Sequence, residues 1–342
     1  MVILTNCLTE QADEGCLKVA NSLTRRIKKK CPSTTVVSYQ RKPAESDHHL
    51  SLNKLFLNRR LFSLLRKKAE PVLYIPFSAC TKATALRIFV LSILGGVPVN
   101  VLFVAVNPLP GVFQRLLRWS RARFFVLSAN SAELIENMTG KPAIYLKTGV
   151  DTRRFCPVSP EQKLLLRKKY GIAQQKTVVL HVGHLKRGRN VATLLDLCDD
   201  FHAILVVSTQ TADSVDVQLR QELLNKSNVT IVDTYQSAVQ ELYQLSDVYY
   251  FPVVEDGNCI DVPLSVLEAA ACGIPVATTD YGELRQLISQ EGFTRLTGFA
   301  PDNLNACLRD AALSGENPRA AVEGYHWDLA VDKLLELNMK EI

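Results

Sequence analysis

Short apolar runs alternate along the first half of the chain with longer segments in which apolar residues recur every three or four positions. The runs predict β-strands, and the longer segments, including 14–30 and 50–68, predict amphipathic helices. The predicted strands are 2–4, 35–39, 72–75, 99–106, 124–127 and 143–146. Strands that alternate with helices build parallel βαβ units, so this half is expected to form a doubly wound α/β domain.

The alternation is interrupted by a polar stretch at 149–160, which contains Gly149, Pro157 and Pro160, and it then resumes. The second set of predicted strands is 177–182, 203–208, 229–232, 248–253 and 275–278, and an amphipathic helix follows at 326–337. We therefore predict Rossmann-like domains at 1–150 and 151–320, with 321–342 as a C-terminal helix that returns toward the first domain. Ligands of such sheets bind beyond the carboxyl ends of the strands, so a cleft that the two domains face is the expected site.

The most apolar stretch, 85–106, does not predict a membrane span. It is interrupted by Arg87, by the pair Gly95 and Gly96, and by Pro98, whereas a spanning helix needs about 20 consecutive apolar residues. We expect a helix, a glycine turn and a buried strand there. We also expect no secretory leader. The 9 cysteines are scattered and none stands in a CxxC pair, which argues against a zinc or disulfide framework and favours a reducing, cytoplasmic location.

Charge is distributed unevenly between the two predicted domains. Residues 1–150 contain 22 Lys and Arg against 8 Asp and Glu, a net charge of +14, whereas the remainder has 18 against 26, a net charge of −8. This asymmetry indicates that the first domain meets an anionic partner. In segments 52–68 and 113–125, Lys and Arg are interleaved with apolar and aromatic residues, which is typical of a helix at a membrane interface or of an ordinary surface helix. No nucleic-acid-binding motif accompanies the charge, so nucleic acid is not an expected partner.

A helix-like segment that begins near residue 261 carries the first candidate site residue. Asp261 is placed to cap this helix, Pro263 suits its first turn and Gly273 suits its end. Glu268 is the sole charged residue within the helix. A carboxylate in an apolar helix needs a partner, which is either a pair of ligand hydroxyls or a backbone amide or arginine of the protein itself.

A basic turn follows the predicted strand at 177–182. Gly183 ends the strand, and the cationic or titratable residues before the next helix, which begins near residue 191, are His184, Lys186, Arg187 and Arg189. Backbone N–H groups at a helix start and Lys or Arg side chains bind diphosphates, so we interpret the turn as a diphosphate site, with a solvated basic loop as the alternative. No G-x-G-x-x-G fingerprint is present, which argues against a dinucleotide-dependent dehydrogenase.

Together these segments resemble the GT-B fold glycosyltransferases, specifically the retaining family 4, or group 1. Four motifs in the family's order carry the resemblance. They are Gly149-Val150-Asp151 with Phe155 and Pro157, His181-Val182-Gly183 with Arg189, the segment 241–252, and the segment 264–276 around Glu268. In addition, Asp13, Glu14 and Gly15, which open a helix, are similar to the family's acceptor-side loop.

The resemblance implies transfer of a hexose, with retention, from a UDP-, GDP- or ADP-sugar, without a metal ion or other cofactor. Arg189 and Lys186 are implied to stabilise the leaving diphosphate, which is electrostatic catalysis. The donor-binding residues that the resemblance implies are Gly183, His184, Arg187, Leu264, Ser265 and Glu268, of which Glu268 is expected to contact the nucleotide ribose.

The chain departs from the family pattern at two positions. Ile260 stands where the first Glu of the family's paired-Glu motif would stand, and the nearest acids are Glu255, Asp256 and Asp261. Asp261 is therefore expected either to replace that Glu as a catalytic residue or to cap the helix. His184 stands where the family usually has an Arg, so that Lys186 or Arg187 is expected to supply the missing charge.

The expected acceptor is a sugar or a lipid-linked molecule. In this family the N-terminal domain usually holds the acceptor, so the domain with a net charge of +14 would meet it at an anionic membrane surface. The protein is then expected to be cytoplasmic and peripheral on the inner face of the membrane. Two other functions stay open: a GT-B sugar-nucleotide epimerase, and a non-catalytic GT-B scaffold, which the missing first Glu supports.

Overall fold

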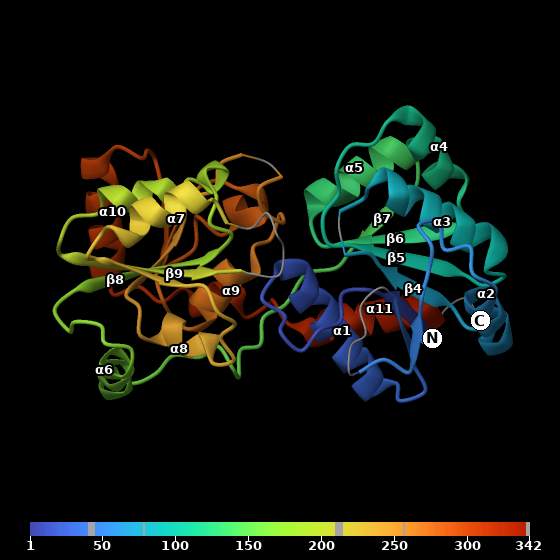
Figure 1. Ribbon diagram of the computed structural model, residues 1–342, viewed down its shortest axis with the longest axis horizontal. Coiled ribbons are helices and arrows are strands. Elements are labelled where there is room, and N and C mark those ends of the chain that lie inside the picture. Colours follow the sequence, from blue (N-terminus) through green and yellow to red (C-terminus); the bar gives the residue numbers. More distant parts are fainter. Residues whose placement is uncertain (40–44, 78, 209–214, 256, 340–342) are drawn as a thin grey trace. The chain divides into compact units, whose positions relative to one another are not determined.

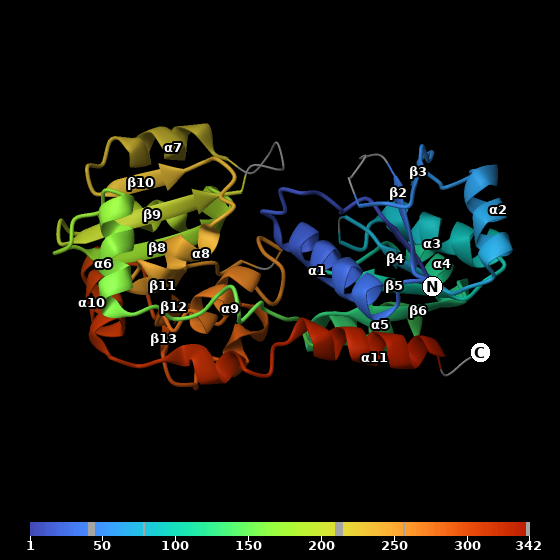
Figure 2. The same cartoon turned by 90° about the horizontal axis from the view of Figure 1, so that it is seen from below.

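The computed structural model describes residues 1–39, 45–77, 79–208, 215–255 and 257–339 (Figures 1 and 2). Its contacts divide the chain into two compact units. Unit 1 consists of Met1–Thr148 together with Trp327–Ile342, and unit 2 consists of Gly149–His326. Each unit is built around one parallel sheet, as the alternation of strands and helices predicts.

Unit 1 contains a seven-stranded parallel sheet in the order β3-β2-β1-β4-β5-β6-β7. Its strands are β1 (Val2–Thr5), β2 (Thr35–Tyr39), β3 (His48–Leu50), β4 (Val72–Ile75), β5 (Val99–Phe103), β6 (Ala122–Val126) and β7 (Ala143–Tyr145). Its helices are α1 (Gly15–Lys30), α2 (Arg59–Lys68), α3 (Lys82–Leu94), α4 (Gly111–Trp119), α5 (Ala129–Thr139) and α11 (Trp327–Met339). All six strands predicted for this half are present, because each buries an apolar run between helical layers.

The helix predicted at 50–68 is wrong in its first half. Asn58 caps α2 instead, since its side-chain oxygen accepts hydrogen bonds from the backbone N–H groups of Arg60 (2.9 Å) and Leu61 (3.1 Å). Before the cap, Phe56 has φ 63° and its buried ring packs against two tyrosines of the sheet. A continuous helix could not place Phe56 there, so tertiary packing overrides the local periodicity.

A further expectation for unit 1 is corrected. The basic segment 113–125 is not one helix, because α4 ends at Trp119 and Arg123 lies in strand β6. His48 and His49 belong to the edge strand β3, which pairs with β2 and which the apolar pattern did not predict. The expectation for 85–106 is confirmed: α3, a glycine turn and β5 occupy it. Across the described ranges, no helix is long and apolar enough to span a membrane.

Unit 2 contains a six-stranded parallel sheet in the order β10-β9-β8-β11-β12-β13. Its strands are β8 (Thr177–Gly183), β9 (Phe201–Val207), β10 (Val229–Val232), β11 (Val248–Phe251), β12 (Val276–Thr278) and β13 (Phe293–Arg295). Its α-helices are α6 (Pro160–Lys169), α7 (Val217–Leu224), α8 (Val239–Gln244), α9 (Leu264–Ala271) and α10 (Pro301–Leu313), and its 3-10 turns are η1 (Arg187–Arg189), η2 (Val191–Asp196), η4 (Gly282–Gln286) and η5 (Pro318–Val322). The five predicted strands are confirmed, and β13 is a sixth that is too short to show an apolar run.

The C-terminal helix α11 packs on unit 1 beside α1 (Figure 2). The Lys30 ammonium bonds the Asp332 carboxylate of α11 (2.5 Å), and the Lys333 ammonium donates to the Tyr145 carbonyl (2.8 Å). Residues 321–326, which we expected to leave with this helix, stay in unit 2. They do so because Tyr325 is buried there and its carbonyl accepts a hydrogen bond from the Val150 N–H (2.9 Å).

Docking of α11 should contribute measurably to the stability of unit 1. Leu334 is fully buried, whereas Leu329 of the same helix is 57% exposed. We predict that Leu334→Ala lowers the free energy of unfolding by about 2–5 kcal/mol, because it removes buried methyl groups and leaves a cavity. Leu329→Ala should change it by less than about 0.5 kcal/mol. Urea unfolding of the full chain provides the measurement, and equal effects of the two changes would contradict the docking described here.

Candidate functional site

The candidate site lies in unit 2, at the carboxyl edge of its sheet, where β8 leads into the basic turn. Asn190 has φ 57° and separates the 3-10 turns η1 and η2, so the turn is not followed by the α-helix that the sequence predicts. The Asn190 side-chain amide donates to the Pro252 carbonyl just after β11 (3.0 Å). The ends of the adjacent strands β8 and β11 are therefore fixed to one another by this turn.

Arg189 is the one arginine of the turn that is buried, with 8% of its surface exposed. Its Nε donates to the Asn258 carbonyl (2.8 Å). A Cβ atom on Gly183 would lie 2.6 Å from Arg189 Nη1, so the missing side chain at Gly183 leaves the space that the guanidinium occupies. Among the described residues, one carbonyl accepts a hydrogen bond from this guanidinium, and a buried cation with further N–H donors is well suited to an anionic ligand.

The loop before α9 is held against the basic turn by backbone-directed hydrogen bonds. The Asn258 side chain donates to the Gly188 carbonyl (2.9 Å). The Tyr281 hydroxyl accepts from the Cys259 N–H (3.0 Å) and donates to the Cys259 carbonyl (2.5 Å). The position where the family motif has its first Glu, Ile260 here, follows directly, so its backbone is fixed although it lacks a carboxylate.

Glu268 lies in the second turn of α9 and is buried. The Tyr243 hydroxyl donates to Glu268 Oε2 (2.8 Å). Tyr243 is thus one protein partner of this carboxylate, which the sequence analysis did not consider. The Tyr243 ring stacks on Tyr249 (5.8 Å between centroids) and meets Phe155 edge-on (5.5 Å). Burial and the adjacent Glu268 carboxylate raise the pKa of Tyr243, so its phenol stays a donor.

The start of α9 supplies free backbone donors near the same edge. Pro263 is its N-cap residue and no side chain caps it. The Val266 N–H is the first to bond the Pro263 carbonyl (3.1 Å), which leaves the N–H groups of Leu264 and Ser265 at the open end of the helix. Because η2 is a 3-10 turn, α9 is the helix whose dipole can favour an anion here.

His181 is a site residue that the sequence analysis quoted only as part of a motif. It is buried, and its Nδ1 lies 2.9 Å from the Tyr250 carbonyl, so Nδ1 carries the hydrogen. Within the described residues its Nε2 has no hydrogen-bond partner. Burial, with the nearby charges of Arg189 and His184, lowers the pKa of His181 to about 4. The signal was the strand period of two, which puts His181 on the same face of β8 as Gly183.

The other predicted residues of the basic turn and of the loop before α9 differ in their exposure and in their bonding partners. Arg187 is exposed and its guanidinium bonds Glu222 of α7 (2.6 Å) and approaches Asp216 (3.6 Å), whereas Lys186 and His184 are half-buried in the turn. Asp261 is not the N-cap of α9, which corrects that expectation. The Asp261 carbonyl accepts from the Glu283 N–H (3.0 Å).

The remaining expected residues lie elsewhere. Asp13, Glu14 and Gly15 belong to unit 1, where Glu14 is the N-cap residue of α1 and Gly15 begins the helix. Asp256 lies outside the described residues.

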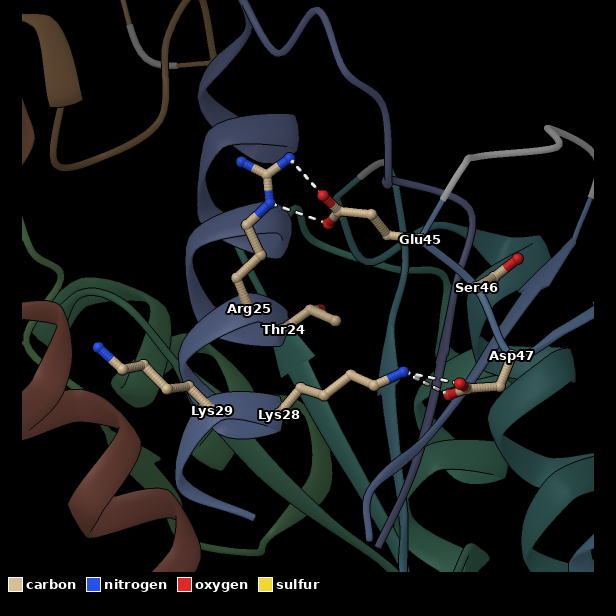
Figure 3. A pocket seen from close by; sticks show the side chains of 7 residues that line it. All are labelled: Thr24, Arg25, Lys28, Lys29, Glu45, Ser46 and Asp47. Atoms are coloured by element: carbon tan, nitrogen blue, oxygen red, sulfur yellow. Dashed lines mark hydrogen bonds and ion pairs between the residues drawn. The ribbon is translucent and has the colours of Figure 1, made fainter. Parts of the chain in front are cut away.

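A separate cavity of about 490 Å³ lies on α1 in unit 1 (Figure 3). Its charged side chains are largely paired with one another, as in the bonds of Arg25 to Glu45 (2.9 Å) and of Lys28 to Asp47 (2.7 Å). Paired, exposed charges contribute little binding energy toward a further ligand. This cavity therefore provides no second candidate site.

Comparison with known proteins relates the chain to glycosyltransferases. The family model described as Glycosyl transferases group 1 matches residues 162–317. A GDP-mannose-dependent monoacylated alpha-(1-6)-phosphatidylinositol monomannoside mannosyltransferase of Corynebacterium glutamicum is 26% identical over 217 residues, which cover 58% of this chain and 56% of that protein. The putative glycosyltransferase EpsD of Bacillus subtilis is 28% identical over 152 residues, which cover 42% of this chain and 39% of EpsD. The aligned parts thus span about half of the first relative and two fifths of the second.

Among solved structures, Anabaena Alr3699/HepE in complex with UDP and glucose superimposes with a TM-score of 0.75 at 13% identity, over 100% of this chain and 99% of that one. WaaG, a glycosyltransferase involved in lipopolysaccharide biosynthesis, gives a TM-score of 0.67 at 14% identity, over 99% and 100% of the two chains. At such identities the likeness shows the fold. The expected GT-B fold, with two Rossmann-like doubly wound parallel sheets, is confirmed.

The loop before α9 depends on the absence of a side chain at Gly282. Gly282 has φ +51°, and a Cβ there would lie 2.4 Å from the Asp261 carbonyl oxygen, whereas Gly315 has φ +69° with open space around it. We predict that Gly315→Ala costs about 1 kcal/mol of unfolding free energy through its backbone conformation. Gly282→Ala should cost about 1–3 kcal/mol more, because Asp261 must move. Urea unfolding measures both, and equal costs would contradict the close approach.

The low pKa of His181 predicts a pH dependence of stability. Its folded pKa of about 4 lies below the ordinary value of 6.5, so the unfolded chain binds the proton more tightly. The resulting stability is complete above pH 6.5 and is lost as the pH falls toward 4, by up to about 3 kcal/mol. His181→Asn, whose amide can still donate to Tyr250, should lose correspondingly less over this range. Urea midpoints at several pH values test this, and parallel profiles for the two proteins would contradict it.

Proposed function

We propose that the protein transfers a hexose from a nucleotide diphosphate sugar to an acceptor, with retention of the anomeric configuration, because residues 162–317 match the model of the group 1 glycosyl transferases. The observation that carries the proposal is the burial of two charged residues on segments that follow neighbouring strands of unit 2, Arg189 in η1 after β8 and Glu268 in α9 after β11. Two buried charges of opposite sign, each on an element that starts at the carboxyl edge of one sheet, match a ligand with an anionic and a hydroxyl-bearing part.

The proposed diphosphate site comprises Arg189, Lys186 and the N–H groups at the start of α9. The guanidinium of Arg189 keeps donors beyond the one that bonds Asn258, and Gly183 leaves room beside it. The N–H groups of Leu264 and Ser265 add the positive end of the α9 dipole. Arg187 is left out of this set because its guanidinium bonds Glu222.

Glu268 is the proposed partner of the nucleotide ribose. One oxygen of its carboxylate accepts from the Tyr243 hydroxyl, which fixes the orientation of the group. An ionised carboxylate can accept several hydrogen bonds at once, so the tyrosine does not exhaust its capacity. Tyr243 would therefore position Glu268 for a hydroxyl of the ligand.

In the proposed reaction, the bond between the anomeric carbon and the diphosphate oxygen breaks as an acceptor hydroxyl oxygen bonds that carbon from the same face. The electron pair of the broken bond goes to the diphosphate, and the acceptor proton passes to a phosphate oxygen of this leaving group. Arg189, Lys186 and the α9 N–H groups would stabilise the charge that develops on the diphosphate, a term that commonly contributes a factor of about 10²–10³ per donor. No metal ion is invoked, and activity that survives chelation would support this.

For the donor we propose two candidate nucleotides, and for the acceptor we propose a chemical class. The Corynebacterium relative is named as GDP-mannose-dependent, and the Anabaena structure holds UDP, so both nucleotides belong in a donor screen. We propose a lipid-linked acceptor, or one at a membrane surface on the cytoplasmic side. The excess of basic residues in 1–150 and the phosphatidylinositol mannoside named for the Corynebacterium relative support this choice.

Replacement of either buried charge should weaken the donor site without unfolding unit 2. We predict that Glu268→Gln weakens nucleotide binding about 10-fold, because it removes a charge-assisted hydrogen bond. Arg189→Gln should lower turnover about 100-fold or more. Calorimetric titration with UDP and GDP, together with product analysis by NMR, measures affinity, rate and anomeric configuration.

Arg309→Gln provides a matched control, because it removes one positive charge that bonds Asp200 on the surface of unit 2. This variant should bind nucleotides as the wild type does. Wild-type affinity and rate in folded Glu268→Gln and Arg189→Gln would sink the assignment of the donor site. Binding of nucleotide without any transfer to a panel of acceptors would favour the non-catalytic scaffold, for which Ile260 is the supporting feature.

A further inference from the structure

Helix α3 exposes an apolar side that an ordinary surface helix would not. Among its residues after Lys82, Arg87 is the sole charged one. One side of the helix is buried against the unit-1 core, through residues that include Ile88 and Leu91. The other side presents Ile93, which is 60% exposed, and the half-exposed Leu94. The outer side of a helix that covers a sheet normally carries polar residues, so this side calls for a partner.

Helix α4 packs beside α3 (Figure 1) and also exposes apolar side chains. Val112 and Trp119 are 59% and 68% exposed. They stand seven residues apart, so they lie on one side of α4, with the half-buried Leu116 between them. An exposed tryptophan combines a large apolar ring with an N–H donor, which is the composition found at the boundary between apolar and aqueous phases.

Positive charge is concentrated in the part of the chain that contains α2, α3 and α4. Residues 48–132, which contain α2, α3 and α4, include 12 Lys and Arg but one acid, Glu70. The carboxylate of Glu70 is bound to the N-terminal amine of Met1 (2.6 Å). The basic end of α2 adjoins the exposed end of α3, because Arg66 Nη2 donates to the Leu94 carbonyl (3.2 Å). At least one cation, Arg66, therefore lies directly beside the exposed apolar end of α3.

Helix dipoles do not account for the arrangement of these charges. Basic residues stabilise the C-terminal turn of a helix, and Lys67 and Lys68 occupy that position in α2. Arg59 and Lys82, however, are the first residues of α2 and α3, where a positive charge is unfavourable, and neither helix has an acid in its first turn. A selective advantage other than helix stability is needed for cations at both ends.

We propose that the face formed by Ile93, Leu94, Val112 and Trp119, with the surrounding Lys and Arg residues, docks on an anionic lipid bilayer. A second copy of this chain would bring the same positive charge and would be repelled. A nucleic acid would pair with the cations but would leave the apolar side chains uncovered. An anionic bilayer can contact both the cations and the apolar side chains, because its headgroups pair with the cations and its interfacial region buries the apolar residues.

The surface assigned here differs from the one that charge patterning alone indicates. Segments 52–68 and 113–125 were interpreted either as interfacial helices or as ordinary surface helices, but α3 lies outside both and supplies the most exposed aliphatic residue of the face. Docking on a membrane would bring the protein to a lipid-linked acceptor, and this biological role rests on the proposed function. Vesicle binding itself needs neither donor nor turnover, so the two can be tested apart.

The test uses the full-length protein with vesicles of phosphatidylcholine alone or with added phosphatidylglycerol. We expect flotation with the anionic vesicles that weakens as salt rises, because exposed charges are screened over about 10 Å at 0.1 M. The chain has 2 tryptophans, and Trp327 is buried, so Trp119 reports the contact directly. Its emission should shift to shorter wavelength on anionic vesicles and be quenched by brominated acyl chains.

Ile93→Ser with Trp119→Ser should reduce vesicle binding at least about 10-fold, in proportion to the apolar surface removed from the contact. Leu164→Ser with Leu165→Ser is the matched control, because both leucines are exposed on α6 of unit 2 and should leave binding unchanged. Lys82→Gln with Arg115→Gln tests the charges without touching the apolar side chains. Each cation near an anionic surface contributes about fivefold, so this pair should weaken binding about 25-fold.

Three results would overturn the inference. The first is negligible flotation with anionic vesicles at low salt. The second is flotation in which Trp119 emission stays unchanged. The third is concentration-dependent dimerisation that Ile93→Ser with Trp119→Ser abolishes, which would assign the face to a second copy of the chain. Nucleotide titration of the same variants separates these outcomes from failure of the donor site: unimpaired UDP or GDP binding without vesicle binding leaves the proposed transfer reaction in place.

Discussion

The placement of a buried guanidinium at the carboxyl edge of unit 2 is the constraint on which the candidate site depends. Arg189 can lie there because Gly183 has no side chain and because the Asn258 carbonyl accepts its Nε–H. That hydrogen bond joins the basic turn to the loop before α9, although the two residues are 69 positions apart. The Tyr281 hydroxyl then clamps the next residue of the same loop, Cys259, by its N–H and carbonyl. Arg189 therefore holds the loop before α9 in position and also supplies the positive charge of the candidate site.

A second set of contacts ties the carboxylate of the site to the body of the unit. Glu268 accepts from Tyr243, and the Tyr243 ring lies between Tyr249 of β11 and Phe155 of the segment that follows unit 1. A buried carboxylate is costly unless it is hydrogen-bonded, so the tyrosine makes the position tolerable in the absence of ligand. The neutral His181 completes a site whose polar groups are held by strand and helix backbones. Such rigid support suits electrostatic catalysis, which needs donors already in place.

The two units divide the chemistry between them. Unit 2 carries the buried Arg189 and Glu268 and contains residues 162–317, which match the group 1 glycosyl transferase model, whereas unit 1 carries the excess of positive charge and the exposed apolar residues of α3 and α4. In unit 1 the cations are mostly exposed, and the proposed membrane contact would depend on their number and on their proximity to a surface. In unit 2 the proposed donor site would depend on the position of one buried cation, Arg189. The same residue types would then serve long-range attraction in one unit and specific recognition in the other because their burial differs.

By itself, the sequence determined the two parallel sheets, the basic turn and the burial of Glu268, because strand and helix periods and a lone charge in an apolar helix are local signals. Only the tertiary structure decided the partners: Tyr243 for Glu268, Asn258 for Arg189 and Glu222 for Arg187. It also broke the helix predicted at 50–68, since Phe56 enters the core, and it left Ile93 of an apolar helix uncovered. Periodicity fixes which residues share a face, but which element covers that face depends on contacts between segments far apart in the chain.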